Sequence, residues 1–170
     1  MSREKTEFAE FFQASWKPCL RAVVASTGSV QLAEDQVAEA FARAWLSWRK
    51  VRRHPVPRAW VVRTALNVGA SWWRRRLREL TLLGHDTEAL RDGAPNYEDG
   101  GLDATLLTAL RHLPDRQREV IALRVFLDLD IDTISAQLGI APGTVRAHLS
   151  RGVATLRREL SLTQAVEADQ

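Results

Sequence analysis

Cysteine is almost absent from the 170 residues of this chain, because Cys19 stands alone. A single thiol can form neither an intrachain disulfide nor a cysteine-rich zinc site, and we expect Cys19 to be a small buried apolar residue. The sequence also has no apolar run near the ~18 residues that a membrane span requires. The charged, helix-like segment 1–12 does not resemble a signal peptide. We therefore expect a cytoplasmic protein that does not insert into membranes.

The motifs of common catalytic and cofactor sites are missing as well. The sequence has no phosphate-binding glycine loop, no HExxH zinc motif, no plausible Ser/Cys–His–acid set and no paired buried carboxylates. His85 has neither a cysteine nor a second histidine at ligand spacing, so we expect it to be solvated. An enzyme, a metal site and a bound cofactor are therefore not expected.

Charge and tryptophan are distributed unevenly along the chain. Residues 1–80 contain 15 Lys/Arg against 7 Asp/Glu, a net charge of +8, and all six tryptophans. Residues 81–101 contain 1 against 5, net −4, with four glycines, and residues 102–170 contain 8 against 9, net −1. We expect two small helical domains, 1–80 and 102–162, joined by a flexible acidic linker at 81–101 and followed by a frayed tail at 163–170. The basic first domain indicates a polyanionic partner.

The spacing of apolar residues predicts an all-α first domain, a bundle of three or four helices. Helices are expected over residues 6–26, 32–51 and 58–80, and Pro18 is expected to kink or divide the first of them. The segment 49–58 concentrates five basic side chains around two prolines. These side chains would repel one another unless they are solvated or bound to phosphate, and the sequence fits either state.

The third expected helix has a polar stripe beside its apolar one. The polar positions step by four, four, three and four residues, which places them on one face: Arg63, Asn67, Ser71, Arg74 and Arg78. The apolar face is predicted to comprise Val61, Ala65, Val68 and Trp72. Trp73 is expected to be either partly exposed or in the core. Arginine, amide and tryptophan side chains on one exposed face suit nucleic acid, where bases stack and phosphates pair.

Residues 128–160 contain two helical patterns separated by a short turn. Gly139 suits the end of the first helix, and Pro142 suits the first turn of the second. Such a pair forms a helix-turn-helix, whose second helix can enter the major groove of DNA. That helix is basic and has no acidic residue between Gly143 and Arg158. The side chains expected to face base edges are Arg146, Ala147, Ser150 and Arg151. An amphipathic core helix with a solvated basic face would show the same apolar spacing.

Three motifs, in this order, resemble the extracytoplasmic-function (ECF) sigma factors of bacterial RNA polymerase. The segment 33–41, AEDQVAEAF, is similar to the family's Ala-Glu-Asp-x-x-Gln-Glu-x-Phe signature. Residues 57–76 are similar to its promoter-opening helix. Residues 113–120, LPDRQREV, and the helix-turn-helix are similar to its region 4. The resemblance covers nearly the whole chain and implies a non-catalytic subunit that directs core polymerase to promoters.

The resemblance also implies a role for each site residue. The helix 35–48 would dock on the clamp helices of the polymerase β′ subunit through exposed contacts, namely Asp35, Gln36, Glu39 and Arg43. The loop 49–58 would hold a flipped base of the non-template minus-ten strand. The minus-ten contacts would be Arg52, Arg53, Arg58, Arg63, Asn67 and Arg74. Region 4 would read the minus-thirty-five element through Arg146, Ala147, Ser150 and Arg151, with Thr144 near phosphate, and would meet the flap of the β subunit. An anti-sigma protein often controls members of this family.

Some positions depart from the family pattern. Ser71 and Thr133 stand where Asp and Glu are common. Ala141 lacks the oxygen of the usual Ser or Thr cap, which should cost roughly 1 kcal/mol of helix-start stability. Ala147 offers a base edge only a methyl group. A helix-turn-helix regulator is the alternative, because residues 144–149 also resemble the LuxR-type reading helix. It predicts tight promoter binding without polymerase.

Overall fold

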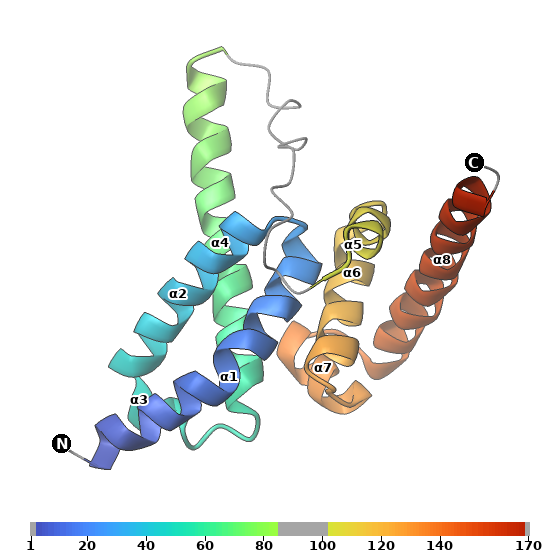
Figure 1. The fold of residues 1–170 in the computed structure, drawn as a ribbon. Helices are drawn as coiled ribbons and strands as arrows, with labels where there is room; N and C mark the ends of the chain where they lie inside the picture. Colours follow the sequence, from blue (N-terminus) through green and yellow to red (C-terminus); the bar gives the residue numbers. More distant parts are fainter. Residues whose placement is uncertain (1–2, 85–101, 169–170) are drawn as a thin grey trace.

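The computed structural model in Figure 1 describes residues 3–84 and 102–168. The first range contains α1 (Arg3–Thr27), α2 (Val30–Leu46), α3 (Trp48–Val51) and α4 (Pro57–Leu82). The second contains α5 (Ala104–Arg111), α6 (Asp115–Ile121), the π-helical turn η2 (Ala122–Phe126), α7 (Ile131–Leu138) and α8 (Pro142–Ala168). The predicted all-α fold with two helical domains is therefore confirmed. His85 and most of the predicted linker lie outside the described residues.

Helix α1 is not divided at Pro18. Proline has no N–H, so the carbonyl of Ala14, four residues earlier, has no donor within the helix. The Nη2 of Arg58 donates to that carbonyl at 2.6 Å, and its Nε donates to Ser15 Oγ at 3.1 Å. The first turn of α4 thus supplies the donor that the proline removes from α1.

The first domain has a core formed by the apolar faces of α1, α2 and α4. Its fully buried residues include Val23, Val37, Val61 and Ala65. The rings of Phe11, Phe12 and Trp16 surround Phe41, with centroids 4.9 to 5.9 Å from that of Phe41. The side of α2 that faces the core is therefore held by aromatic packing from α1.

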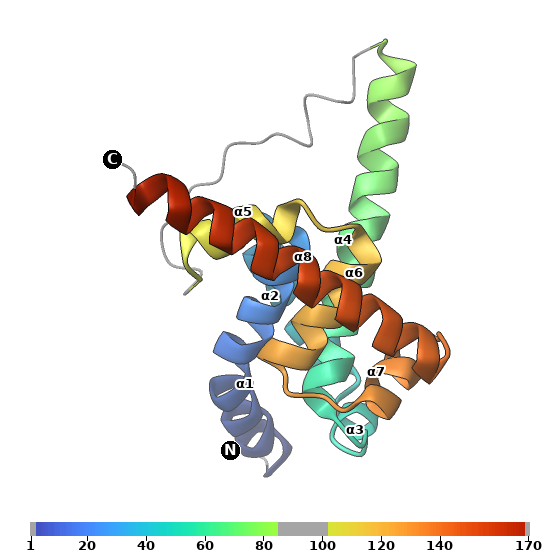
Figure 2. The ribbon, with the colours of Figure 1, turned by 90° about the vertical axis from the view of Figure 1, so that its right-hand side faces the viewer.

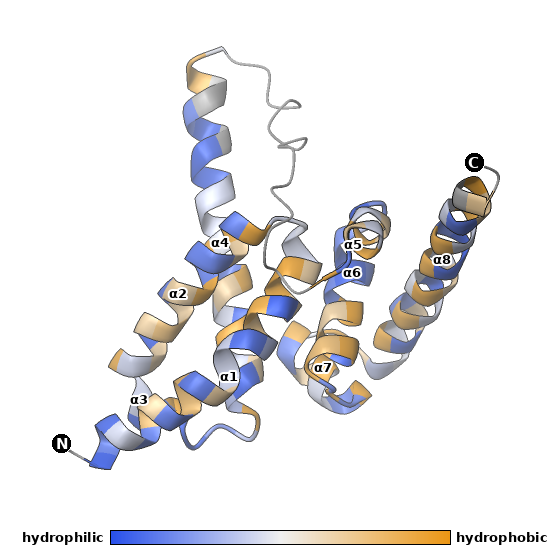
Figure 3. Cartoon of the chain, viewed as in Figure 1, coloured by the Kyte–Doolittle hydropathy of each residue, from blue (hydrophilic) through white to orange (hydrophobic). Residues whose placement is uncertain are grey.

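Helix α4 extends past the rest of the first domain. Beyond Gly69 it projects away from the bundle, and this part is largely hydrophilic (Figures 1 and 3). Its apolar face is buried as far as Val68, but Trp72 is 41% exposed and Trp73 is half-buried. The expectation that Trp72 belongs to the buried face is wrong, because the helix has left the bundle at that turn.

The second domain packs α5, α6 and α7 against α8. Its buried residues include Leu107, Leu110, Ile134 and Val145. Gly139 ends α7 in the left-handed conformation, with φ of +64°, and Pro142 is the first residue of α8. Both predictions are confirmed. Helix α8 continues to Ala168, so the expectation that the chain frays after Leu162 is wrong.

The two domains are in contact. Helix α1 packs on α2 and α4 and also on α5, α6 and η2 (Figures 1 and 2). Leu20 and Val23 of α1 share one buried apolar cluster with Leu107 and Leu123 of the second domain. Periodicity along the sequence did not predict this packing.

Candidate nucleic-acid interface

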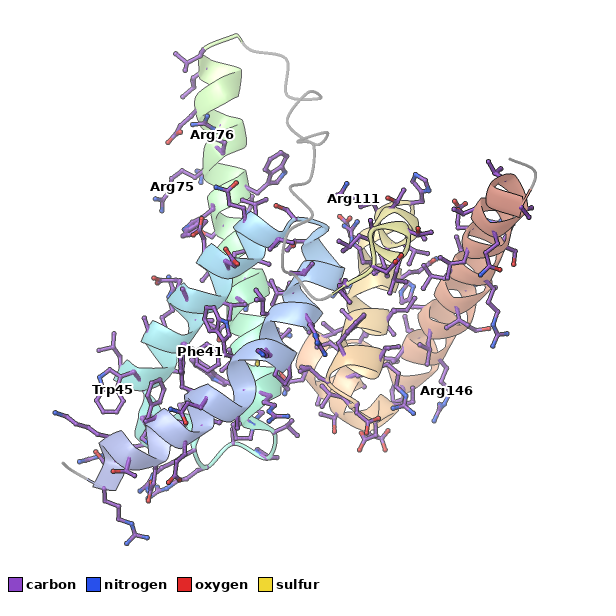
Figure 4. All side chains as sticks on the ribbon, viewed as in Figure 1. Phe41, Trp45, Arg75, Arg76, Arg111 and Arg146 are labelled. Carbon is purple, nitrogen blue, oxygen red and sulfur yellow. The ribbon has the colours of Figure 1, made fainter. Side chains whose placement is uncertain are left out.

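The N-terminal turns of α8 present the residues expected to read DNA. Arg146, Ser150 and Arg151 are exposed, as is Thr144, and Ala147 is half-buried. Figure 4 shows Arg146 extending from the outer surface of α8. Val145, on the opposite face, is completely buried. The helix is thus anchored by one face, while the basic face is open to solvent.

The turn before α8 is fixed by hydrogen bonds rather than by a side-chain cap on that helix. Ser135 Oγ donates to the carbonyl of Ile140 at 2.6 Å, and the N–H of Gly139 donates to the carbonyl of Ser135 at 2.9 Å. At the other end of α7, Asp130 accepts from the backbone N–H of Thr133 at 2.7 Å. That bond is the main reason why the pKa of Asp130 lies below its usual value. These contacts fix the angle at which α8 leaves the domain.

Helix α4 carries a second basic surface, on the other domain. Arg63, Asn67 and Arg74 are exposed along it, as the sequence predicted. Figure 4 shows Arg75 and Arg76 on the projecting part of the same helix. A straight helix with a cationic stripe can follow a phosphate backbone for several nucleotides.

The arginines of the basic segment 49–58, which runs from α3 into the first turn of α4, have different partners. Arg58 donates to two atoms of α1 and so acts within the domain. Arg52 and Arg53 are both exposed, and Arg52 Nη1 donates to Glu7 Oε2 at 3.1 Å. Arg49 pairs in the same way with Glu4, with 3.1 Å between Nε and Oε1. The N-terminal end of α1 therefore supplies carboxylates to this basic segment, which sequence reasoning did not foresee.

The exposed face of α2 has polar and apolar parts. Asp35 is exposed, and Glu39 accepts from Arg43 Nε at 2.7 Å. Leu32 and Leu46 are 49% and 85% exposed. Sequence reasoning missed these two leucines, although their positions outside the apolar stripe of α2 could have identified them as exposed.

Gln36 differs from its neighbours on α2. It is only 5% exposed, so the expectation that it is an exposed contact is wrong. Its side chain lies over Gly69 of α4, where an added Cβ would come within 2.4 Å of the amide nitrogen. The absence of a side chain at Gly69 is what allows α2 and α4 to approach and cover Gln36.

The single cysteine, Cys19, is buried and unreactive. Burial raises the pKa of the Cys19 thiol to about 12, and its Sγ donates to the carbonyl of Arg58 at 3.8 Å, so this cysteine is a poor nucleophile. No group of three or more His, Cys, Asp or Glu that could hold a metal occurs within residues 3–84 and 102–168. Over the same ranges, no helix has the length and apolarity to cross a membrane.

Each of the two domains matches the model of a known protein family. Residues 15–79 match the family model of Sigma-70 region 2, and residues 103–156 match that of Sigma-70, region 4. The ECF RNA polymerase sigma factor SigL of Mycobacterium tuberculosis is 31% identical over 88% of this chain and 85% of its own. The RNA polymerase sigma-E factor of Streptomyces coelicolor is 28% identical over 92% of this chain and 88% of its own.

A solved structure is similar across both domains. It is the co-crystal structure of the sigma factor RpoE in complex with the anti-sigma factor NepR from Bartonella quintana. The TM-score is 0.75 at 25% sequence identity, over 91% of this chain and 97% of that one.

Two exposed basic helices on separate helical domains are typical of a transcription factor that binds DNA at two places. The matches to both regions define the class further: the chain belongs to the ECF family of RNA polymerase sigma factors. As a sigma factor it binds core RNA polymerase and promoter DNA and directs promoter recognition and the initiation of transcription. It is a non-catalytic subunit, as the sequence predicted.

Proposed function

We propose that the two domains divide promoter recognition between them. The domain within residues 1–80 opens the minus-ten element, and the domain within residues 102–162 grips the minus-thirty-five element as intact duplex. The observation that carries this division is the placement of one exposed basic helix in each domain, α4 and the start of α8. Two weak contacts on one chain raise each other's effective concentration when the linker lets both sites be occupied.

Strand opening is, on this proposal, a binding reaction. Unstacking a base step costs a few kcal/mol, and this chain supplies no nucleotide hydrolysis to offset it. Arg63, Asn67 and Arg74 of α4 would hold the separated strand, and Arg53 would contact phosphate beside the extruded base. Arg58 would act indirectly, by holding the start of α4 against α1.

The polymerase would be held mainly by α2. Asp35 and Arg43 are exposed on α2 and Glu39 is half-buried, and the exposed Leu32 and Leu46 would add apolar area to the β′ clamp interface. Region 4 would meet the β flap through a surface other than the DNA-reading face of α8. The protein would act in the cytoplasm, where the polymerase is found.

An anti-sigma protein is a further proposed partner. Support comes from the similarity to RpoE, whose structure is a complex with such a protein. An inhibitor of this kind would act by covering the surfaces on α2, α4 and α8 that polymerase and promoter need.

The test measures promoter binding and promoter opening separately. A promoter is first identified by mapping transcription start sites after overexpression, and 2-aminopurine in its minus-ten element then reports opening by holoenzyme. Asn67→Ala should slow opening with little change in binding. Arg146→Ala should weaken discrimination at the minus-thirty-five element by about 1–3 kcal/mol.

Equal loss of binding on every sequence would make Arg146 a phosphate contact only. Slower binding with unchanged opening in Asn67→Ala would contradict the role of α4. Arg157→Ala, which removes an exposed arginine further along α8, is the matched control and should leave both readouts near wild type.

A further inference from the structure

The end of α2, the short helix α3 and the first turn of α1 form a cleft of about 350 Å³. This volume lies within the range of small-molecule sites, which is about 300–1,000 Å³. The cleft combines indole rings, a leucine, two basic side chains and one carboxylate. The residues that line it include Glu4, Trp45, Leu46, Trp48, Arg49 and Lys50.

The two tryptophans of the cleft pack on the same aromatic ring of α1. The centroid of Phe8 lies 5.1 Å from that of Trp45 and 5.2 Å from that of Trp48. Trp48 is only 7% exposed, whereas Trp45 is 39% exposed. Packing therefore holds Trp45 in place while part of its surface stays open to solvent. A flat aromatic ligand can stack on an indole presented in this way.

Trp48 contributes a buried hydrogen-bond donor that has no acceptor. Its indole Nε1 is covered and makes no hydrogen bond within residues 3–84 and 102–168. A buried tryptophan usually finds a partner for this N–H, and leaving such a donor unpaired is unfavourable. A ligand acceptor that displaced the side chains covering this nitrogen would form a bond that the protein alone leaves unmade.

Positive charge lies beside the same aromatic surface. Lys50 is exposed and has no ion pair among the residues that the structure describes. Arg49 pairs with Glu4 at 3.1 Å, and the two side chains are 83% and 40% exposed. An ion pair this exposed contributes little to stability, so an incoming anion can replace Glu4 at Arg49. The two cations together suit a phosphate group.

The position of the cleft favours a free nucleotide over a promoter strand. Arg63 and Asn67, the proposed strand-holding residues, line a separate crevice whose other wall belongs to the second domain. Figure 4 shows Trp45 at the outer end of α2, far from Arg75 and Arg76 on α4. A strand that follows α4 would therefore not pass over the cleft, whereas a single small molecule can occupy it alone.

We propose that this cleft binds a free nucleoside phosphate, and that the bound nucleotide weakens association with core polymerase. The base would stack on Trp45 with an acceptor at Trp48 Nε1, and the phosphate would lie on Lys50 and Arg49. Leu46 lines the cleft and also belongs to the surface proposed to meet the β′ clamp, so the nucleotide and the clamp would compete for it. Only this competition rests on the proposed function.

Isothermal titration calorimetry of the full chain with GMP and with AMP measures binding. At least one nucleotide should bind, and its nucleoside and ribose 5-phosphate should each bind at least tenfold more weakly. Trp45→Ala and Lys50→Gln should each weaken binding about tenfold. Trp48→Phe keeps a ring in the core and removes only the N–H, so it should weaken binding several-fold.

Lys17→Gln is the matched control, because it removes an exposed lysine of α1 that does not line the cleft. It should leave the affinity for the nucleotide unchanged. Circular dichroism identifies a variant that has lost helix, and Lys50→Gln, a change at an exposed position, then decides the outcome.

No binding of either nucleotide at millimolar concentration, or equal affinity for ribose 5-phosphate, would overturn the proposal. A single-stranded oligonucleotide that binds more tightly than either nucleotide, and loses that advantage in Trp45→Ala, would overturn it too, because the occupant would then be DNA. Normal initiation by the same chain would leave the proposed function intact.

The competition is measured as the rate of association with core polymerase, with and without the nucleotide. The nucleotide should slow association of the wild type and not that of Lys50→Gln, which also controls for nucleotide sites on the polymerase. Equal rates for the wild type with and without bound nucleotide would overturn the competition. A chain that binds the nucleotide but never associates with core polymerase would contradict the proposed function and leave the cleft's ligand standing.

Discussion

Arg58 donates to the backbone carbonyl of Ala14, the carbonyl that Pro18 leaves without a helical donor. The side chain that the sequence suggested as a DNA contact thus holds α4 on α1. The proline and the arginine act together. The Ala14 carbonyl is free to accept from Arg58 because residue 18, as a proline, has no N–H to donate to it. They are 40 positions apart in the chain, and local patterns connect neither to the other.

Arg58→Ala should lower the free energy of unfolding by about 1–2 kcal/mol, because a carbonyl and a hydroxyl lose a charged donor. In a Pro18→Ala background the loss should be smaller by about 0.5 kcal/mol or more, since the residue at 18 can then donate to Ala14 itself. Urea denaturation of the four chains of this double-mutant cycle measures the coupling. Purely additive losses would show that the two residues act independently.

Gly69→Ala should destabilise the first domain by about 1–3 kcal/mol, because the new Cβ would overlap the side chain of Gln36. Thermal unfolding measures the loss. Gly143→Ala is the control, since no atom lies within 4 Å of a Cβ there and the residue is helical. That change should be neutral or slightly stabilising. Equal effects of the two substitutions would mean that α2 and α4 are not in close contact at Gly69.

Arg53→Ala should reduce the slope of log binding constant against log salt concentration by about 0.7–0.9, the value for one lost phosphate contact. Glu7→Gln should steepen the slope, because it frees Arg52 and Arg3 from their ion pairs with Glu7, and Arg52 can then contact phosphate. Filter binding of holoenzyme to promoter DNA between low and moderate salt gives the slopes. Arg21→Ala, an exposed position on α1, should not change the slope. An unchanged slope for Arg53→Ala would mean that this arginine is only solvated.

Asp130 should make the stability of the helix-turn-helix domain depend on pH. Its pKa is lowered in the folded chain, mainly by the hydrogen bond from Thr133 N–H. The stabilisation is therefore complete above the unfolded pKa, near pH 4, and is lost as the pH falls through the lowered value. The advantage of wild type over Asp130→Ala should shrink below about pH 4 in denaturant unfolding. Asp130→Asn keeps an oxygen acceptor without a titrating charge, so its advantage over Asp130→Ala should not follow this pH dependence.

Local pattern predicted the parts of the fold that depend on local chemistry. The end of α7 at Gly139 and the start of α8 at Pro142 follow from backbone conformation, and the exposed positions of Arg146 and Arg151 follow from helical phase. The same reasoning failed at Trp72, because periodicity shows which face is apolar but not where a helix leaves its bundle.

The features that the sequence did not predict depend on contacts between segments that are far apart in the chain. Gln36 lies among polar residues of α2 and is buried only because Gly69, 33 positions later, has no side chain. Arg111 donates to the carbonyl of Gly28, 83 positions away, and nothing near either residue indicates the other. Glu4 and Glu7, at the start of α1, pair with Arg49 and Arg52, and nothing near either carboxylate in the sequence indicates these partners.

The most direct test of the account compares promoter binding and initiation by the purified chain with and without core RNA polymerase. The account predicts a stable complex with core polymerase, initiation from a mapped promoter by that complex, and weak, poorly specific binding of the free chain to the same DNA. Tight and specific promoter binding by the free chain, together with no association with core polymerase, would contradict it and would favour a classical helix-turn-helix regulator.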